Sequence, residues 1–358
     1  MISKSKNALI VWDRAGHYHL ARYRNLAKKP IFFDQVYLAN LGSSDTLYKW
    51  GGVDDSIIQL SKKGVDRTDL LNRLAKFRSV LRGKEISHVI ISGYGRVDYI
   101  LFIILSALNR KKVILFAESW YDKNAISRFI KRFFLQAFVS GLFVSGKRAY
   151  NHFKNEIGLK KLPIETGYSA VDNEHFASDT SAQRNEILCV ARYSKEKNLK
   201  NLITAFRNSK AYADYKLQII GDGPLRPYLE AEINLDNDKI MLETWKSYEE
   251  LPNYYAKAKY FILPSTFEPW GLVVNEAMAA GRPVLLSEQC GCLPDFLSQE
   301  FGFVFDPNNV EDITNSINDA LSLTTSDYKL QSEFMKNQVS KFDLDNWSEQ
   351  LIKLASQC

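Results

Sequence analysis

The chain has 358 residues, of which 46% are hydrophobic, and it carries a formal net charge of +6. This length predicts about two domains of ordinary size, and the apolar content is sufficient to build a core in each. No stretch approaches the ~20 apolar residues that span a bilayer, and the four cysteines lack the CxxC spacing typical of zinc sites.

The N-terminal segment, MISKSKNALIVWDRAG, passes from a short basic lead directly into an apolar run. It lacks the pattern of a secretory signal peptide. Together with the unpaired cysteine spacing, this favours a cytoplasmic location.

Apolar runs typical of strands alternate with helix-like segments along the first half of the chain. The strand runs are NALIVWD, KPIFFDQVYLA, HVIISGY and KVILFAES, and the intervening helices include HYHLARYRNLAKK and RTDLLNRLAKFRSVLRG. The apolar segment at 99–108, YILFIILSAL, is expected to be a buried helix.

The second half repeats this alternation, with strand runs at EILCVARY, KLQIIGD, KIMLET, YFILPS and RPVLLS. Alternating β and α elements of this length indicate an α/β protein with two doubly wound parallel sheets. We expect domains at 1–164 and 165–342, followed by an amphipathic helix at 343–358.

The most informative segment is 260–288, YFILPSTFEPWGLVVNEAMAAGRPVLLSE. A strand ending at Leu263 is followed by a loop with Glu268, and a helix from Leu272 contains Glu276. Ligands of parallel sheets bind beyond the carboxyl ends of the strands, so we expect both carboxylates to face one cleft. Gly271 lets the backbone approach a ligand, and the first helical N–H groups can bind phosphate. A sugar nucleotide needs both carboxylates and amides.

FEPWGLVVNEAMAAGRPV resembles the Glu-x7-Glu segment of retaining glycosyltransferases of the GT-B fold, family 4. The resemblance implies two Rossmann-like domains facing a central cleft, with the C-terminal helix crossing back to the first domain. Three further segments match in order, and one of them, TGYSAVDNEHF at 166–176, resembles the entry into the second domain of the family, with Val171, Asp172 and Phe176 in place. CVARYSKEKNLKNLITAF resembles the phosphate site of the family, with Arg192 and Lys197 in place, and YKLQIIGDGPLRPYLEAEI contains Gly221 and Gly223.

The resemblance assigns roles to these residues. Glu268 holds the sugar, Arg192 and Lys197 stabilise the departing diphosphate, and Glu276 binds the ribose. Gly223 is equally explained as part of an ordinary helix start. The full set of expected donor-binding residues is Gly16, Gly221, Gly223, Pro269, Trp270, Gly271, Leu272, Val273 and Glu276.

In the first domain, the loop around Gly16 occupies the place of the family's glycine loop, which often has two adjacent glycines. His17, Tyr18 and His19 are candidate acceptor-binding residues, although a histidine at a helix start is often only a neighbour of the cap. Glu118 stands where many relatives carry histidine, and it either polarises the acceptor hydroxyl or forms a salt bridge.

No metal or cofactor is expected. Two Asp-x-Asp triplets, Asp236 with Asp238 and Asp343 with Asp345, are interpreted as turn and helix-cap residues. The co-substrate is a nucleoside-diphosphate sugar, for which a UDP-hexose such as UDP-glucose is favoured over GDP-mannose.

Charge is distributed unevenly. Residues 1–170 hold 29 Lys and Arg against 13 Asp and Glu, a net of +16, whereas the remainder carries −10. The segment SRFIKRFFLQAF at 127–138 combines basic residues with phenylalanines in one expected helix, which indicates peripheral attachment to an anionic membrane; the residues are Arg128, Lys131 and Arg132 with Phe129, Phe133 and Phe134. The alternative is that the phenylalanines pack in the core. No nucleic-acid motif is visible.

These observations predict a retaining, metal-independent hexosyltransferase acting on a glycan or lipid-linked acceptor in cell-surface polysaccharide or glycolipid assembly. Two alternatives stay open. One is a GT-B epimerase or phosphorylase, and the other is a non-catalytic scaffold that binds sugar nucleotides at a membrane.

Overall fold

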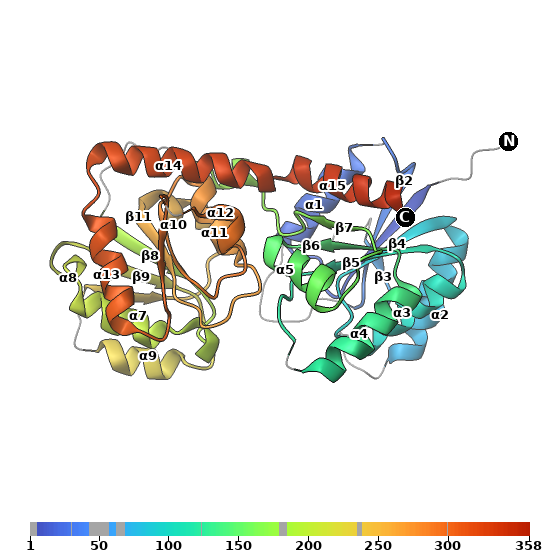
Figure 1. Ribbon diagram of the computed structural model, residues 1–358, viewed down its shortest axis with the longest axis horizontal. Helices are drawn as coiled ribbons and strands as arrows, with labels where there is room; N and C mark the ends of the chain where they lie inside the picture. Colours follow the sequence, from blue (N-terminus) through green and yellow to red (C-terminus); the bar gives the residue numbers. More distant parts are fainter. Residues whose placement is uncertain are drawn as a thin grey trace. The chain divides into compact units, whose positions relative to one another are not determined.

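A computed structural model describes residues 6–29, 31–42, 57–61, 69–122, 124–178, 185–234, 238–298 and 300–358. The chain forms two compact units (Figure 1). The first comprises Met1–Ala170 together with Leu344–Cys358, and the second comprises Val171–Asp343.

The first unit is built on a seven-stranded parallel sheet with the order β3-β2-β1-β4-β5-β6-β7. Its strands are β1 (Asn7–Trp12), β2 (Gln35–Asn40), β3 (Ile58–Gln59), β4 (Ile86–Ile91), β5 (Lys112–Ala117), β6 (Gly141–Val144) and β7 (Ile164–Thr166). Its helices are α1 (His17–Ala27), α2 (Leu70–Gly83), α3 (Val97–Leu108), α4 (Ala125–Phe138), α5 (Lys147–Asn151) with a π-helical turn (His152–Glu156), and α15 (Leu344–Gln357).

Both faces of this sheet are covered, because successive side chains of each strand point to opposite faces. Leu9 and Val11 of β1 pack with side chains from α2, α3 and α4. Ala8 and Ile10 instead face the core formed with α1 and α15. In that core, Trp347 of α15 is fully buried and packs against Phe116 and Phe143.

The second unit contains a six-stranded parallel sheet with the order β10-β9-β8-β11-β12-β13. Its strands are β8 (Glu186–Val190), β9 (Lys216–Ile220), β10 (Ile240–Glu243), β11 (Ala258–Leu263), β12 (Val284–Ser287) and β13 (Phe303–Phe305). Its helices are α6 (Asn173–Phe176), a 3-10 turn (Lys195–Lys197), α7 (Leu199–Asn208), α8 (Ala211–Asp214), α9 (Arg226–Ile233), α10 (Leu251–Lys257), α11 (Leu272–Ala279), α12 (Leu293–Phe296), α13 (Val310–Leu321), α14 (Thr325–Val339) and a second 3-10 turn (Ser340–Phe342).

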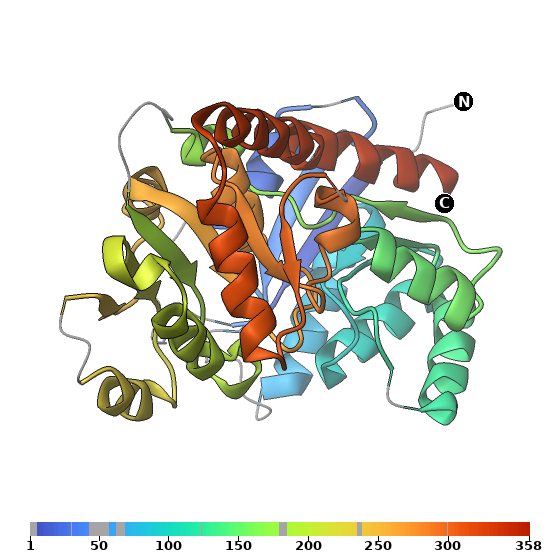
Figure 2. The same cartoon turned by 60° about the vertical axis from the view of Figure 1, so that its left-hand side comes forward.

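Helices α7 and α13 lie side by side on one face of this second sheet (Figures 1 and 2). Leu202 and Ile203 of α7 and Ile313 of α13 are buried there. The predicted α/β class and the two parallel sheets are therefore confirmed.

Two details of the prediction were wrong. The apolar run KPIFFDQVYLA does not form one strand, since β2 begins at Gln35, where pairing with Asn7 starts. Ile31, which precedes it, is in a turn and is 79% exposed. Helix α3 is also not buried all round, because Phe102 and Ile103 face the core whereas Leu108 is 73% exposed.

Among the residues that the structure describes, no helix combines the length and apolar character needed to cross a membrane.

Candidate functional site

The loop that follows β11 holds Glu268 in a fixed position. The Glu268 N–H donates to the carbonyl of Gln289 over 3.2 Å, and the Glu268 carbonyl accepts from the N–H of Gly291 over 2.9 Å. These bonds fasten the loop to the segment after β12, so Glu268 stands at the carboxyl end of the sheet. Its side chain is almost buried, with the residue 8% exposed.

Lys197 and Glu268, which are 71 positions apart in sequence, form an ion pair between Nζ and Oε2. The same carboxylate oxygen accepts a 3.2 Å hydrogen bond from the Ser265 hydroxyl. The structure thus brings together two residues that the sequence assigned to the reaction. Removing either partner leaves a charge in a largely desolvated place, where lone charges are costly.

Hydrogen bonds of the neighbouring residues hold Lys197 in this position. It ends the 3-10 turn before α7, and the next residue, Asn198, adopts the left-handed conformation with φ of 55°. The Asn198 side-chain amide donates to the carbonyls of Pro264 and Pro307. The N–H of Thr266 donates to the Glu196 carbonyl over 2.8 Å, so this loop and the Glu268 loop are fastened directly to each other.

Arg192 lies in the same loop between β8 and α7, two residues beyond the end of β8. Its side chain is exposed. The pKa of Glu196 is lowered, first by a hydrogen bond from Ser194 and also by the positive charges of Lys197 and Arg192. The loop also contains Lys195, so its three basic residues outnumber the one carboxylate, and the resulting net positive charge at the carboxyl end of the sheet suits a diphosphate.

Gly221 and Gly223 lie against the backbone of this same loop. A Cβ atom on Gly221 would be 1.9 Å from the Ala191 carbonyl oxygen, and one on Gly223 would be 2.5 Å from the Tyr193 carbonyl oxygen. The N–H of Tyr193 donates to the Asp222 carbonyl over 2.9 Å. The two glycines are thus required for packing between two loops, whatever they contribute to a ligand.

Gly271 ends the Glu268 loop in the left-handed conformation with φ of 101° and precedes α11. A Cβ atom there would crowd Leu263 and the side chain of Glu268 itself. Leu272 and Val273 occupy the first two helical positions and are half-buried, as is Pro269. Their N–H groups belong to the first turn of the helix, where N–H groups favour anions.

Two residues predicted to line the cleft are placed in the interior. Glu276 is fully buried, and its Oε2 accepts a 2.6 Å hydrogen bond from Tyr255 of α10. The indole of Trp270 donates to Asn275 over 2.9 Å and packs edge-on against Phe296. Any contact of Trp270 with a donor must therefore come from its backbone. The expectation that Glu268 and Glu276 both face an open cleft is not met in this structure.

The reason is that α11 is covered by other parts of the protein, and its residues from Val274 to Ala279 are all buried, including the polar Asn275 and Glu276. Such a helix belongs to a core. Sequence reasoning also missed Tyr255 and Ser265, the hydrogen-bond partners of the two glutamates. No spacing pattern connects Tyr255 with Glu276, since they come from different helices.

In the first unit, Gly16 is the N-cap of α1, and its N–H donates to Nδ1 of His19 over 3.2 Å. The His19 ring lies on Trp12, with 4.6 Å between ring centroids. Burial, aided by the positive charge of Arg22, lowers the pKa of His19 to about 3. His19 is therefore neutral with Nδ1 as acceptor. His17 and Tyr18 are half-buried beside it.

Glu118 directly follows β5 and is half-buried, and its Oε1 accepts a 2.9 Å hydrogen bond from Ser169. Nearby, the buried guanidinium of Arg22 donates through Nε and Nη2 to the Ala170 carbonyl at 2.9 and 2.6 Å. Tyr168 packs beneath the same guanidinium. Arg22 and Ser169 were not predicted, and the carboxylate is embedded in a polar cluster rather than standing alone.

The aspartate triplets have different surroundings. Asp345 lies in the first turn of α15 and pairs with Lys29 over 2.8 Å. Asp343 immediately precedes that helix. Asp238 has a φ of 55° just before β10, and Asp236 lies outside the described residues.

Comparisons with known proteins show which family and which fold this chain resembles. Residues 171–339 match the family described as "Glycosyl transferases group 1". The chain is 26% identical over 202 residues to an uncharacterized glycosyltransferase of Methanocaldococcus jannaschii, covering 55% of this chain and 52% of that protein. It is also 26% identical over 238 residues to the N-acetylgalactosamine-N,N'-diacetylbacillosaminyl-diphospho-undecaprenol 4-alpha-N-acetylgalactosaminyltransferase of Campylobacter jejuni, covering 62% of each protein. The alignments thus span less than two thirds of either relative.

Among solved structures, Anabaena HepE in complex with UDP-glucose superposes with a TM-score of 0.76 at 15% identity. The match covers 98% of this chain and 100% of that one. At this identity the similarity establishes the fold, which is the GT-B fold.

Proposed function

Because the chain belongs, through its second unit, to the glycosyl transferases group 1 family, we propose that it transfers a hexosyl unit from a nucleoside diphosphate to an acceptor hydroxyl with retention of configuration. The Lys197–Glu268 ion pair carries this proposal. It places a cation suited to a leaving diphosphate beside a carboxylate suited to sugar hydroxyls.

In the proposed reaction the bond between the anomeric carbon and the diphosphate oxygen breaks, the acceptor oxygen attacks the face from which the diphosphate leaves, and the proton of the acceptor hydroxyl passes to the departing diphosphate. Arg192 and Lys197 stabilise the negative charge that develops on the leaving group, a role in which fixed charges contribute strongly. Glu268 holds the hydroxyls of the donor sugar. Because the two basic side chains meet the charge of the diphosphate, we propose that no metal ion is needed.

We assign roles to the remaining donor-binding residues according to where their polar atoms lie. The first N–H groups of α11, at Leu272 and Val273, bind phosphate or hydroxyl oxygens. Glu276 accepts hydrogen bonds from the ribose, while its Oε2 keeps the hydrogen bond from Tyr255. In the first unit, Glu118 polarises the acceptor hydroxyl, whereas His19 fixes the loop of Gly16 through its Nδ1.

A UDP-hexose, with UDP-glucose first, is the proposed donor, supported by the UDP-glucose bound in the similar HepE structure. A lipid-linked saccharide is the proposed acceptor, supported by the undecaprenol-linked substrate in the name of the Campylobacter relative. The protein then acts in the cytoplasm at the inner membrane face, in polysaccharide or glycolipid assembly.

The first test is release of free nucleoside diphosphate from UDP-glucose and from GDP-mannose. We expect release that depends on an added lipid-linked or soluble glycan acceptor. Release without any acceptor would favour a hydrolysing relative, and tight binding without release would favour a scaffold.

The second test replaces Glu268 with Ala. Since its proposed contacts strengthen in the transition state, kcat should fall about 100-fold or more, whereas the Kd for UDP should change much less. Lys197→Ala should weaken both. Glu333→Ala, which changes an exposed carboxylate on α14, is the matched control and should leave both unchanged. Near-normal turnover of Glu268→Ala would contradict the assignment of this loop.

A further inference from the structure

Helix α4 carries two apolar faces rather than one. Phe134, Leu135 and Phe138 pack on the core of the first unit. Four other apolar residues, spaced at i, i+3, i+4 and i+7, form a second face of the helix. They are Ile126, Phe129, Ile130 and Phe133, and they are 62–73% exposed. We call these four residues the outer stripe.

A groove of about 520 Å³ continues the outer stripe toward α3. Its apolar wall is made by Ile100, Ile126, Ile130 and Phe134. Tyr94, Asn124, Ser127 and Lys131 supply polar groups to its lining. Helices α3 and α4 lie side by side in both views of the unit (Figures 1 and 2). A contiguous exposed apolar surface of this kind on a soluble fold marks a binding surface.

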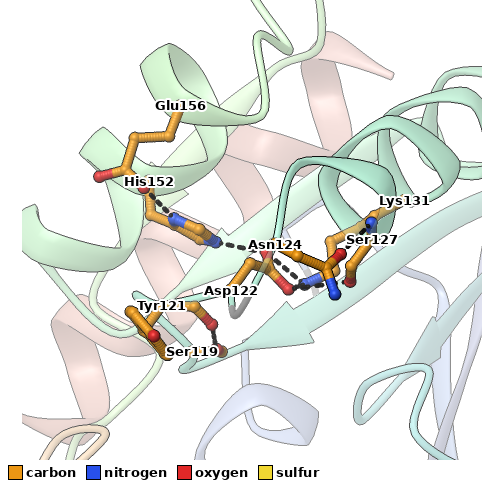
Figure 3. A network of polar contacts seen from close by, with 8 residues as sticks. All are labelled: Ser119, Tyr121, Asp122, Asn124, Ser127, Lys131, His152 and Glu156. Atoms are coloured by element: carbon orange, nitrogen blue, oxygen red, sulfur yellow. Dashed lines mark hydrogen bonds and ion pairs between the residues drawn. The ribbon is translucent and has the colours of Figure 1, made fainter.

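The exposure of the stripe does not come from a loosely held helix, because a polar network fixes α4 (Figure 3). Asn124 caps the helix by accepting from the N–H of Ser127 over 2.8 Å. Lys131 pairs with Asp122 over 2.6 Å, and His152 contacts the same carboxylate over 2.8 Å. Figure 3 shows Asp122 between the two basic side chains, joining α4 to the turn that contains His152.

The charges that border the stripe are positive. Arg132 is exposed and lies three positions beyond Phe129, next to it on the helix surface, whereas Arg128 directly precedes Phe129 and is half-buried. Helix α4 contains no acidic residue, and residues 1–170 carry a net charge of +16. Lys131 differs from these two arginines, because its ammonium is occupied by Asp122 on the inner side.

We propose that the outer stripe and its groove dock on an anionic lipid bilayer. Ile126, Phe129, Ile130 and Phe133 enter the boundary between headgroups and acyl chains, and the groove receives part of a lipid chain. Arg128 and Arg132 bind lipid phosphates. A second copy of the chain fits this surface less well, because two stripes facing each other would bring four arginines together, whereas a lipid phosphate complements them.

The proposal concerns lipid binding and goes beyond sugar transfer, so it is tested without donor or acceptor. Sedimentation with phosphatidylcholine vesicles, with and without phosphatidylglycerol, gives the partition of the protein. Binding should rise with phosphatidylglycerol and fall with salt, because exposed charges are screened beyond about 8 Å at physiological ionic strength.

Three variants locate the surface. Phe129→Ser with Phe133→Ser should reduce the vesicle partition by about 10-fold per phenylalanine. Arg128→Gln with Arg132→Gln should reduce it by about 5-fold per charge on anionic vesicles only. Leu330→Ser, which removes a 55% exposed leucine from α14 of the second unit, is the matched control and should bind normally. All of the substituted side chains are exposed or half-buried. We therefore expect the variants to have the same circular dichroism spectrum and the same melting temperature as the wild type.

Several results would overturn the proposal. One is equal vesicle binding by the double phenylalanine variant and the wild type, and another is binding that ignores phosphatidylglycerol. Concentration-dependent self-association that the same variant abolishes would show that a second copy covers the stripe. Loss of sugar transfer to a soluble acceptor, with vesicle binding intact, would concern the proposed function and not this surface.

Discussion

At Gly221 the backbones of two loops meet so closely that only a hydrogen atom fits on the α-carbon. The nearest atom to an added Cβ is the Ala191 carbonyl oxygen, which is backbone and cannot rotate away as a side chain could. The loop of Arg192 and Lys197 therefore takes its position partly from the loop that follows β9.

This contact predicts that Gly221→Ala is severely destabilising. One loop must move by more than 1 Å, which is comparable to overpacking a core and should cost about 3 kcal/mol or more. Thermal denaturation measures the effect, and weaker UDP binding should accompany it because Arg192 and Lys197 are displaced. Gly95→Ala is the control, since no atom lies within 4 Å of a Cβ at Gly95. Equal melting of the two variants would contradict the close approach.

For individual residues, local sequence patterns predicted part of the candidate site. They identified Glu268 and Lys197 separately, through two motifs. The bond between them joins positions 71 residues apart, and so it depends on the strand order of the folded sheet. The burial of Glu276 escaped prediction because its hydrogen-bond partner, Tyr255, belongs to another helix.

At the scale of secondary-structure elements, α4 shows that helical periodicity alone does not decide which face of a helix is buried. The segment contains two apolar stripes at helical spacing, and either one can face the core. The sequence hypothesis grouped Phe129, Phe133 and Phe134 together, whereas the structure buries Phe134 partly and exposes the other two. It also grouped Lys131 with Arg128 and Arg132, although Lys131 is paired with Asp122.

Strand length likewise limits which strands can be predicted from the sequence. The long runs at β1, β5 and β11 are predicted because continuous apolar stretches are typical of buried parallel strands. Strands β3 and β7, with two and three residues, are too short to show any period. Their places in the sheet come from pairing with β2 and β6.

The network around Asp122 gives a prediction for α4 as an element. Hydrogen bonds from Lys131 and His152 lower the pKa of Asp122 in spite of the opposing effect of its burial. Asp122→Asn should destabilise the first unit by about 2–4 kcal/mol, because it leaves the Lys131 ammonium without a counter-charge in a place where its side chain is only 13% exposed.

A double-mutant cycle with Lys131→Met separates the ion pair from the packing of the helix. The double variant should recover part of the loss, since both buried charges are then gone. Additive losses in the two single variants would show that Asp122 and Lys131 act independently, against the geometry of Figure 3.

For the whole molecule, the two units have separate cores and should respond to different perturbations. Burial lowers the pKa of His19 to about 3 and that of His88 to about 4, and both histidines belong to the first unit. The unfolded chain protonates histidine near pH 6.5, so it binds more protons than the folded unit below that value. Stability is therefore lost as the pH falls from about 6.5 toward 4.

At pH 5.5 each histidine should lower the free energy of unfolding of the first unit by about 1.4 kcal/mol relative to pH 7.5. His19→Asn should remove about half of the combined effect of pH on this free energy. UDP at 100 times its Kd should instead stabilise the second unit by about 2.7 kcal/mol. Hydrogen exchange resolved by segment measures both effects. Acid weakening confined to residues 171–343 would contradict the assignment of the pKa shifts.

The composition of the first unit from two separate segments has a consequence for biosynthesis. On the ribosome, residues 1–170 emerge long before Leu344–Gln357, while the second unit, a single continuous segment, can complete its sheet in between. Until α15 arrives, the site that receives Trp347, Leu351 and Leu354 stays uncovered, and Phe116 and Phe143 line part of it. The nascent first unit therefore exposes an aromatic surface to chaperones throughout translation of the second, and it closes only after that unit has been made.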